Sequence, residues 1–323
     1  MRVSSSEVLG AAESTGFQPV MVEKVLRLLL LLNALNSHPF LDGKWALKGG
    51  TALNLFVFDV PRLSVDIDIN YVGPAGRDEM MEERGEIEKA LAAVFSREGL
   101  EVKKAAEEHA GGKWRLGYEG FDGQPGNLEV DLNFMFREPL WGVDRRDSRA
   151  FGALRAEGIP VLDLHELAAG KLAALFSRGK ARDLFDCHCV LSAGLLDRER
   201  LRIAFVVYGA LNRRDWRSVC AEDVNCDPQE LARQLLPTLD ARFVMKHGPP
   251  EEYAARLVSE CRRAVSVVLP FTEAERRFLD LALDQGRIEP ELLTSDTAVQ
   301  ARIRRHPMLR WKAHHVRQYK NLP

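Results

Sequence analysis

Two segments in the first half of the chain alternate between apolar and polar residues. Between residues 63 and 71 the apolar side is Leu63, Val65, Ile67 and Ile69, and the polar side is Ser64, Asp66, Asp68 and Asn70. Side chains two residues apart in a strand share a face, so this pattern predicts a half-buried strand. Residues 128–136 repeat it, with Leu128, Val130 and Leu132 facing inward and Glu129, Asp131 and Asn133 facing outward.

Helical periodicity and turn residues predict the other elements. We expect helices at 19–35, 52–58 and 77–98, strands at 45–47, 100–104 and 113–118, and a loose leader over residues 1–18. From residue 160 onward we find no strand pattern, only helices separated by turns. The predicted fold class is therefore α+β: a mixed sheet with helices, followed by an all-α C-terminal domain. We place the domains at 1–155 and 156–323.

Composition narrows the class of protein. The 323 residues are 46% hydrophobic, and 45 basic residues nearly balance 47 acidic ones, which excludes a uniformly basic nucleic-acid coat. Five cysteines do not suggest a disulfide framework, which favours a reducing compartment. No apolar run approaches the roughly 20 residues of a membrane span. We expect a cytoplasmic protein with no membrane partner.

The strand at 63–71 carries the strongest candidate chemistry. Asp66 and Asp68 project from one face, where carboxylate oxygens suit hard divalent cations such as Mg²⁺. A neighbouring strand could add a third carboxylate, from Asp131 or from Glu129. Two metal ions held in this way stabilise the attacking and leaving oxygens of phosphoryl-type transfer. Taken alone, such a pair also fits an ordinary solvated strand face.

Gly49-Gly50 follows a predicted strand and precedes a predicted helix. Backbone without side chains can approach a phosphate closely, and a helix N-terminus favours an anion. A lone Gly-Gly pair is also a common turn. The order of glycine pair, paired aspartates on a strand and a later acidic strand is much more restrictive than each feature by itself. No Walker A motif is present here.

Lys171 falls within the apolar stripe of a helix predicted to begin at Asp163 and Glu166, which have the spacing of a capping box. A lysine there must snorkel, pair with an acid or face a polar cavity, where it could hold a triphosphate. Asp183 and Asp186 share a face of the next helix. They could hold Lys171 or Arg182, act as a general base, or form a surface ion-pair cluster.

Two further features concern metals and partners. Cys187-His188-Cys189 does not have zinc-ligand spacing, and we expect His188 to be a core histidine. The C-terminus after residue 297 carries no acidic residue, and Trp311 and Tyr319 lie among its basic side chains. This composition suggests a surface that binds RNA, or else a helix that packs on the acidic first domain. The basic residues are Arg302, Arg304, Arg305, Arg310, Lys312, Arg317 and Lys320.

These motifs resemble a known family. Residues 47–53 (LKGGTAL) and 62–69 (RLSVDIDI) are similar to the AbiEii/AbiGii nucleotidyltransferase toxins, which include the MenT toxins and share the fold of DNA polymerase beta. Residues 166–175 (ELAAGKLAAL) and 178–186 (RGKARDLFD) resemble that family's third and fourth motifs. Val65 departs from the pattern, since many relatives have an acidic residue there.

The resemblance implies a function and a set of roles. It implies transfer of NMP from an NTP to the 3′ end of tRNA, with two Mg²⁺ (or Mn²⁺) and a cognate antitoxin. A protein or small-molecule acceptor, or a non-catalytic nucleotide-binding module, is the alternative. The implied catalytic residues are Asp66, Asp68, Lys171 and Asp183; the metal ligands are Asp66, Asp68 and Asp131; the substrate-binding residues are Gly49, Gly50, Thr51, Ser64 and Arg182. Ser64 is also a candidate for inactivating phosphorylation.

Overall fold

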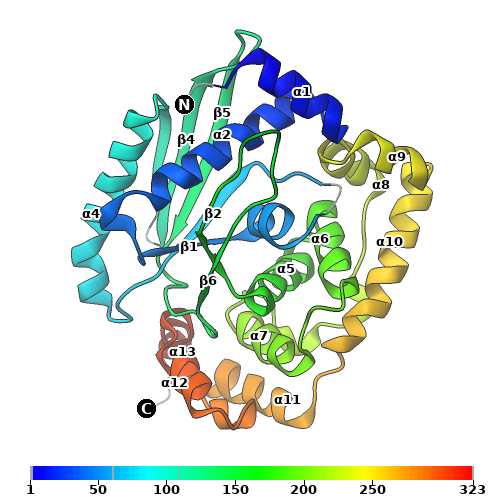
Figure 1. The fold of residues 1–323 in the computed structure, drawn as a ribbon. Coiled ribbons are helices and arrows are strands. Elements are labelled where there is room, and N and C mark those ends of the chain that lie inside the picture. The colour runs from blue at the N-terminus through cyan, green and yellow to red at the C-terminus, as the bar shows by residue number, and fades with distance from the viewer. Residues whose placement is uncertain (1–2, 60–61, 109, 322–323) are drawn as a thin grey trace. The chain divides into compact units, whose positions relative to one another are not determined.

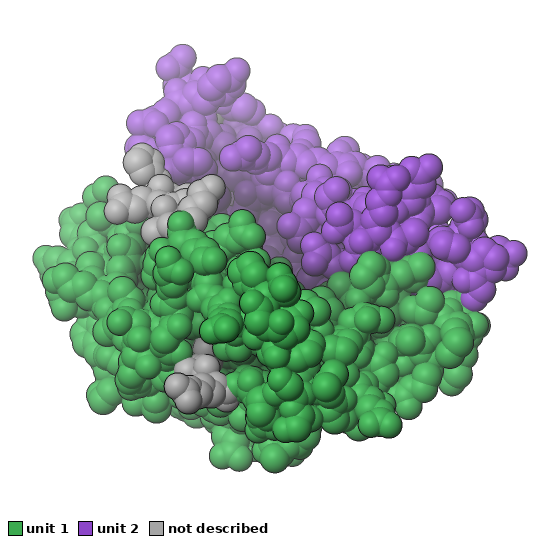
Figure 2. All heavy atoms as spheres, turned by 90° about the horizontal axis from the view of Figure 1, so that it is seen from above, with its two compact units in different colours: residues 1–137, 143–162, 236–247 green, residues 138–142, 163–235, 248–323 purple. Residues whose placement is uncertain are grey.

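The computed structural model describes residues 3–59, 62–108 and 110–321, and Figure 1 shows their arrangement. The chain forms two compact units, coloured separately in Figure 2. Unit 1 comprises residues 1–137, 143–162 and 236–247, and unit 2 comprises 138–142, 163–235 and 248–323. No helix in the described part of the chain is long and apolar enough to cross a membrane.

Unit 1 is built on a mixed seven-stranded sheet in the order β3-β4-β5-β2-β1-β7-β6. The central strand β2 is antiparallel to β1 and parallel to β5, while β7 is parallel to β1. The α+β fold class is therefore confirmed. The strands are β1 Trp45–Lys48, β2 Asp66–Tyr71, β3 Glu101–Glu108, β4 Gly111–Glu119, β5 Pro125–Asn133, β6 Val143–Arg146 and β7 Ile159–Leu162.

Helices α2 (Pro19–Asn36) and α4 (Arg77–Arg97) lie over one face of this sheet, and α2 contacts both β5 and β7 (Figure 1). Their apolar side chains pack against the apolar side of the alternating strands, such as Ile67 and Ile69 of β2. The polar side of the same strands therefore points to the opposite face. Both helices begin and end close to the predicted bounds.

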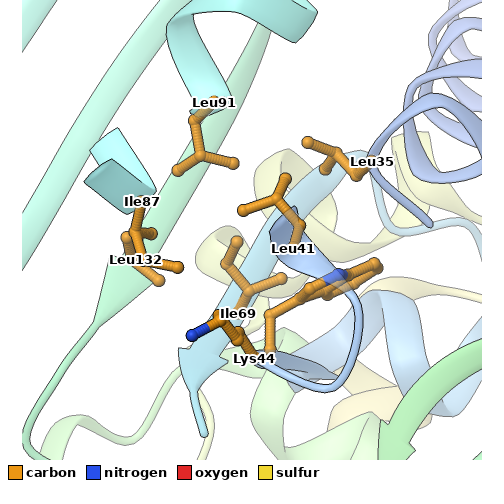
Figure 3. A pocket seen from close by; sticks show the side chains of 8 residues that line it. Leu35, Leu41, Lys44, Ile69, Ile87, Leu91 and Leu132 are labelled. Carbon is orange, nitrogen blue, oxygen red and sulfur yellow. The ribbon is translucent and has the colours of Figure 1, made fainter. Parts of the chain in front are cut away.

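Figure 3 shows a small cavity on the helix-covered face of the sheet. Ile69 and Leu132 from the strands meet Leu35 of α2 and Ile87 and Leu91 of α4 around it. Its volume of about 10 Å³ is at the lower limit for one water, and its lining is apolar. This cavity is a packing defect of the core and is too small to hold a nucleotide.

Three sequence expectations about unit 1 are wrong. Residues 1–18 are not a loose leader, because α1 (Ser5–Thr15) begins there with a capping box between Ser4 and Glu7. Strand β7 was missed because all four of its residues are buried, which leaves no alternation to detect. Strand β6, which pairs with β7, was missed as well. The first unit consequently extends through Leu162, beyond the boundary expected at 155.

Unit 2 is helical, and its core is formed where α5 packs against α6 and α7, and α6 against α10. Large apolar side chains such as Phe205 and Trp216 fill that core. The helices of eight or more residues are α5 Leu164–Arg178, α6 Ala181–Ser192, α7 Arg198–Ala210, α10 Pro250–Ala264, α11 Glu273–Asp280, α12 Thr297–Arg305 and α13 Pro307–Tyr319. The prediction of a helical second half is confirmed from residue 163 onward. A short helix, α9 (Ala241–His247), belongs to unit 1.

Candidate active site

The acidic face of unit 1 lies on the two central strands, β2 and β5. Their parallel register pairs Asp66 with Glu129 and Asp68 with Asp131. Residues paired across a ladder point to the same face, about 5 Å apart. Four carboxylates from two strands therefore project together, each half-buried. The predicted grouping of Asp66, Asp68 and Asp131 on one face is present, and Glu129 belongs to it too.

The Gly49-Gly50 turn, where β1 ends and the short helix α3 (Gly49–Thr51) begins, lies directly against this face. Gly49 has φ +73°, and a Cβ on it would lie 2.3 Å from the Oδ2 atom of Asp68. A Cβ on Gly50 would lie 2.7 Å from the Oγ atom of Ser64. Only glycine permits this approach, because any side chain at Gly49 would displace the carboxylate. The turn, Ser64 and Asp68 thus form one continuous surface.

Two buried side chains support that surface. The Thr51 hydroxyl is fully buried and donates to the Asp66 carbonyl oxygen at 2.5 Å. Arg62, also buried, donates to the Leu63 carbonyl oxygen at 3.0 Å. Thr51 was expected among the substrate-binding residues; its observed contact instead fixes the start of β2 relative to the glycine turn.

Lys113 of β4 is a component of the site that sequence reasoning missed. The register places it opposite Asp131, and its ammonium forms an ion pair with Glu129 at 3.1 Å. The Glu129 hydrogen bond raises the pKa of Lys113, and Asp131 and Asp66 act in the same direction. Lys113 offsets part of the negative charge of the face. No spacing along the sequence reveals this, because β4 meets β5 only through the sheet.

The carboxylates suit an open metal site rather than a closed protein cage. Among the described residues, no group of three or more His, Cys, Asp or Glu side chains is placed so that it could hold a metal ion together. Mg²⁺ in proteins commonly takes one or two carboxylates and completes its shell with water and substrate phosphates. Asp66 and Asp68, which share one face of β2, meet this smaller requirement.

Lys171 of α5 lies between two aspartates of α6 in unit 2. Its Nζ is 2.7 Å from Oδ2 of Asp186 and 3.3 Å from Oδ1 of Asp183. The Asp183 carboxylate also accepts from Nε and Nη2 of Arg178, at 2.6 and 3.0 Å. Both aspartates are almost completely buried, whereas the lysine side chain is 12% exposed. The arrangement holds the ammonium between the two carboxylates, while a small part of the lysine side chain is exposed.

Three expectations about this region need revision. Arg182 is exposed, and Arg178 takes the place beside Asp183 that was considered for it. Glu166 does not complete a capping box with Asp163; it is buried and accepts from the Trp141 amide and the Tyr208 hydroxyl. His188 is not a core histidine, because it is half-buried and lies 3.0 Å from a Glu260 carboxylate oxygen.

The basic C-terminal tract is largely engaged within unit 2. Arg302 donates to the Leu140 carbonyl oxygen, and Arg305 pairs with Glu138 at 2.6 Å. Lys312 donates to a backbone carbonyl of the loop after α7. These contacts account for much of the basic charge by packing, so an RNA surface cannot be inferred from the charge count alone.

Taken together, the mixed sheet, the glycine turn and the acidic strand pair define the class of nucleotidyltransferases. A family model described as "Nucleotidyl transferase AbiEii toxin, Type IV TA system" matches residues 30–266. The chain therefore belongs to the AbiEii family of nucleotidyltransferase toxins of type IV toxin–antitoxin systems, as the motifs had indicated. The enzyme class and the family resemblance are both confirmed.

A solved structure supports the fold. The chain is similar to MenT4, a nucleotidyltransferase toxin from Mycobacterium tuberculosis H37Rv, with a TM-score of 0.60 and 17% sequence identity. The match covers 93% of this chain and 98% of that one. No curated protein matches the sequence. Family membership implies an NTP substrate, divalent metal use and an antitoxin partner.

Proposed function

We propose that this protein transfers NMP from an NTP to the 3′ hydroxyl of tRNA in the cytoplasm, with pyrophosphate as the leaving group, using two Mg²⁺ ions held by Asp66, Asp68 and Asp131. The observation that carries the proposal is the contact between the Gly49 turn and the Asp68 carboxylate on the acidic face. It puts backbone without side chains directly next to the paired carboxylates. When bound, the metal ions would supply charge stabilisation for the attacking and leaving oxygens.

Each residue then has a specific task. Gly49 and Gly50 let the Asp68 carboxylate and Ser64 lie directly against the backbone of the turn, and we place the triphosphate beside this surface. Lys171 holds phosphate as a point charge, and Asp183 and Asp186 keep its ammonium in position. The Lys171 assignment rests on the family motif and on its polar surroundings. Thr51 and Arg62 keep the turn and the β2 strand in register.

We assign the third metal ligand to Asp131 and not to Glu129. Asp131 lies beside Asp68, the carboxylate that contacts Gly49, whereas Glu129 lies beside Asp66 at the start of β2. The matched variants Asp131→Asn and Glu129→Gln separate the two. We expect Asp131→Asn to lower the transfer rate by about 100-fold or more, because the transition-state charge loses stabilisation. We expect Glu129→Gln to stay within about tenfold of wild type; the opposite ranking would contradict the assignment.

The acceptor is tested with chemically blocked tRNA. Total tRNA, intact or oxidised with periodate at its terminal ribose, is incubated with each α-labelled NTP in turn. We expect label on intact tRNA only, because oxidation destroys the 3′ diol. Equal labelling of intact and oxidised tRNA would show that the acceptor is not the 3′ end. Label on a protein or a small molecule, with none on tRNA, would replace the RNA acceptor with that alternative.

A further inference from the structure

The outer face of α13, the last helix of unit 2, carries a row of exposed rings. Trp311, His315 and Tyr319 follow one another at four-residue spacing, and Trp311 and Tyr319 are 49% and 89% exposed. The Trp311 and His315 rings are in contact, with centroids 4.2 Å apart. A helix rises about 1.5 Å per residue, so Trp311 and Tyr319, eight residues apart, lie roughly 12 Å apart along the helix axis.

This row, which we call the ring ladder, is made of Trp311, His315 and Tyr319. Core packing does not explain it, because the opposite side of α13 does the packing: Leu309 and Ala313 are buried there. Large exposed aromatic side chains that lie together mark interaction sites. Among the described residues, the exposed large aromatic side chains are Trp311, Tyr319 and Phe40. Phe40 lies in unit 1.

The charge around the ring ladder is positive. Arg310, next to Trp311 in the sequence, is exposed, and so is Arg213, which follows the Asn212 whose carbonyl accepts from Lys312 of α13. The sequence has no acidic residue after Asp296. Two carboxylates near the inner side of α13 are engaged: Asp215 by Arg217, and Asp284 by Arg217 and Lys320.

We propose that the ring ladder and its flanking cations bind single-stranded RNA. Rings stack on unpaired bases, and cations neutralise the neighbouring phosphates. The roughly 12 Å between Trp311 and Tyr319 along the helix axis is well above the 3.4 Å between stacked bases, so the ladder fits a strand whose bases are splayed apart. The inference deepens the proposed function and rests on it for the identity of the acceptor.

Binding is measured without NTP, so that docking and transfer can fail separately. The probe is a labelled single-stranded RNA of about 12 nucleotides, compared with the same sequence as a duplex. We expect Trp311→Ala to weaken single-strand binding about tenfold, and the triple variant Trp311→Ala/His315→Ala/Tyr319→Ala about 100-fold or more. The matched control Phe40→Ala removes an exposed ring from unit 1 and should bind as wild type does.

The outcomes distinguish RNA binding by the ring ladder from transfer of NMP to tRNA. If the triple variant binds RNA as tightly as wild type, the ladder proposal is overturned, whether or not transfer occurs. Loss of antitoxin binding in that variant, with RNA affinity unchanged, would also overturn it and assign the face to a protein. If the triple variant loses RNA affinity while the wild-type protein labels no RNA with any NTP, the ladder stands and the transfer to tRNA fails.

Discussion

Gly49 combines an unusual backbone conformation with direct contact to Asp68, a proposed metal ligand. Its φ of +73° lies in the left-handed region, and the Asp68 carboxylate occupies the space of a side chain. Gly43 offers a matched control, because it has φ +69° and open space around it. Both glycines carry the same conformational demand, and only Gly49 contacts the acidic face.

We therefore predict different outcomes for Gly49→Ala and Gly43→Ala. Each should cost about 1–2 kcal/mol of unfolding free energy from the positive φ. Gly49→Ala should additionally lower the transfer rate by about 100-fold, because it displaces Asp68 by an ångström or more. The comparison requires urea unfolding and steady-state transfer rates for both variants. Equal transfer rates would show that the turn does not set the position of Asp68.

Lys171 illustrates how a buried charge can serve both structure and chemistry. Removing it leaves Asp183 and Asp186 buried with one cation fewer, which typically costs about 3–5 kcal/mol. Loss of activity in Lys171→Met alone would therefore not distinguish unfolding from lost phosphate binding. The double variant Lys171→Met/Asp186→Asn removes one charge of each sign from the group.

For that double variant we predict recovery of stability without recovery of activity. Its unfolding free energy should return to within about 1–2 kcal/mol of wild type, since the charges balance again. Transfer should stay as low as in Lys171→Met, because no ammonium is left to hold phosphate. Thermal unfolding and a transfer assay on the same preparations test this. Full activity in the stable double variant would remove Lys171 from the proposed mechanism.

At the scale of elements, alternation and helical period predicted most of the sheet and helices. Strands β2 and β5 were predicted because one side of each is polar, and α2 and α4 because each has an apolar stripe. Strand β7 has no polar side, and α1 begins at a serine-rich segment whose capping box was the available signal. The position of Lys113 beside the acidic face depends on the register between β4 and β5. The spacing of residues along the sequence does not predict that register.

Helix α5 also carries a buried acid that responds to pH. Glu166 is 3% exposed and accepts from the Trp141 amide at 3.2 Å and from the Tyr208 hydroxyl at 3.1 Å. Burial raises the pKa of Glu166 to about 7, although these hydrogen bonds favour the charged form. The folded protein therefore prefers the protonated acid. Its stabilising contribution is full below about pH 4.5 and is lost as the pH rises through 7.

We predict that Glu166→Gln removes this dependence. Relative to wild type, the variant should gain about 1–3 kcal/mol of unfolding free energy between about pH 5 and pH 8, because the amide cannot ionise. Urea unfolding of both proteins across this range gives the difference, in which the other titrating groups cancel. A difference that stays constant with pH would show that Glu166 does not titrate on folding.

At the scale of the whole molecule, the two units are interleaved along the chain. Residues 236–247 return to unit 1, where the Leu63 amide donates to the Thr238 carbonyl oxygen just before β2. Residues 138–142 leave unit 1 and are held in unit 2 through Arg302 and Arg305. A single domain boundary cannot describe this organisation, because the chain passes between the units several times. The two short segments concerned have no distinctive composition, so the sequence does not reveal them.

The central claim is that the acidic face of β2 and β5 catalyses transfer of an NMP group, and one measurement tests it most directly. The protein is incubated with tRNA and NTP labelled at either the α- or the γ-phosphate, with Mg²⁺ or with excess EDTA, beside Asp66→Ala. The account predicts label on tRNA only from the α-phosphate, only with Mg²⁺, and not with the variant. Label from the γ-phosphate, or undiminished transfer by Asp66→Ala, would contradict it.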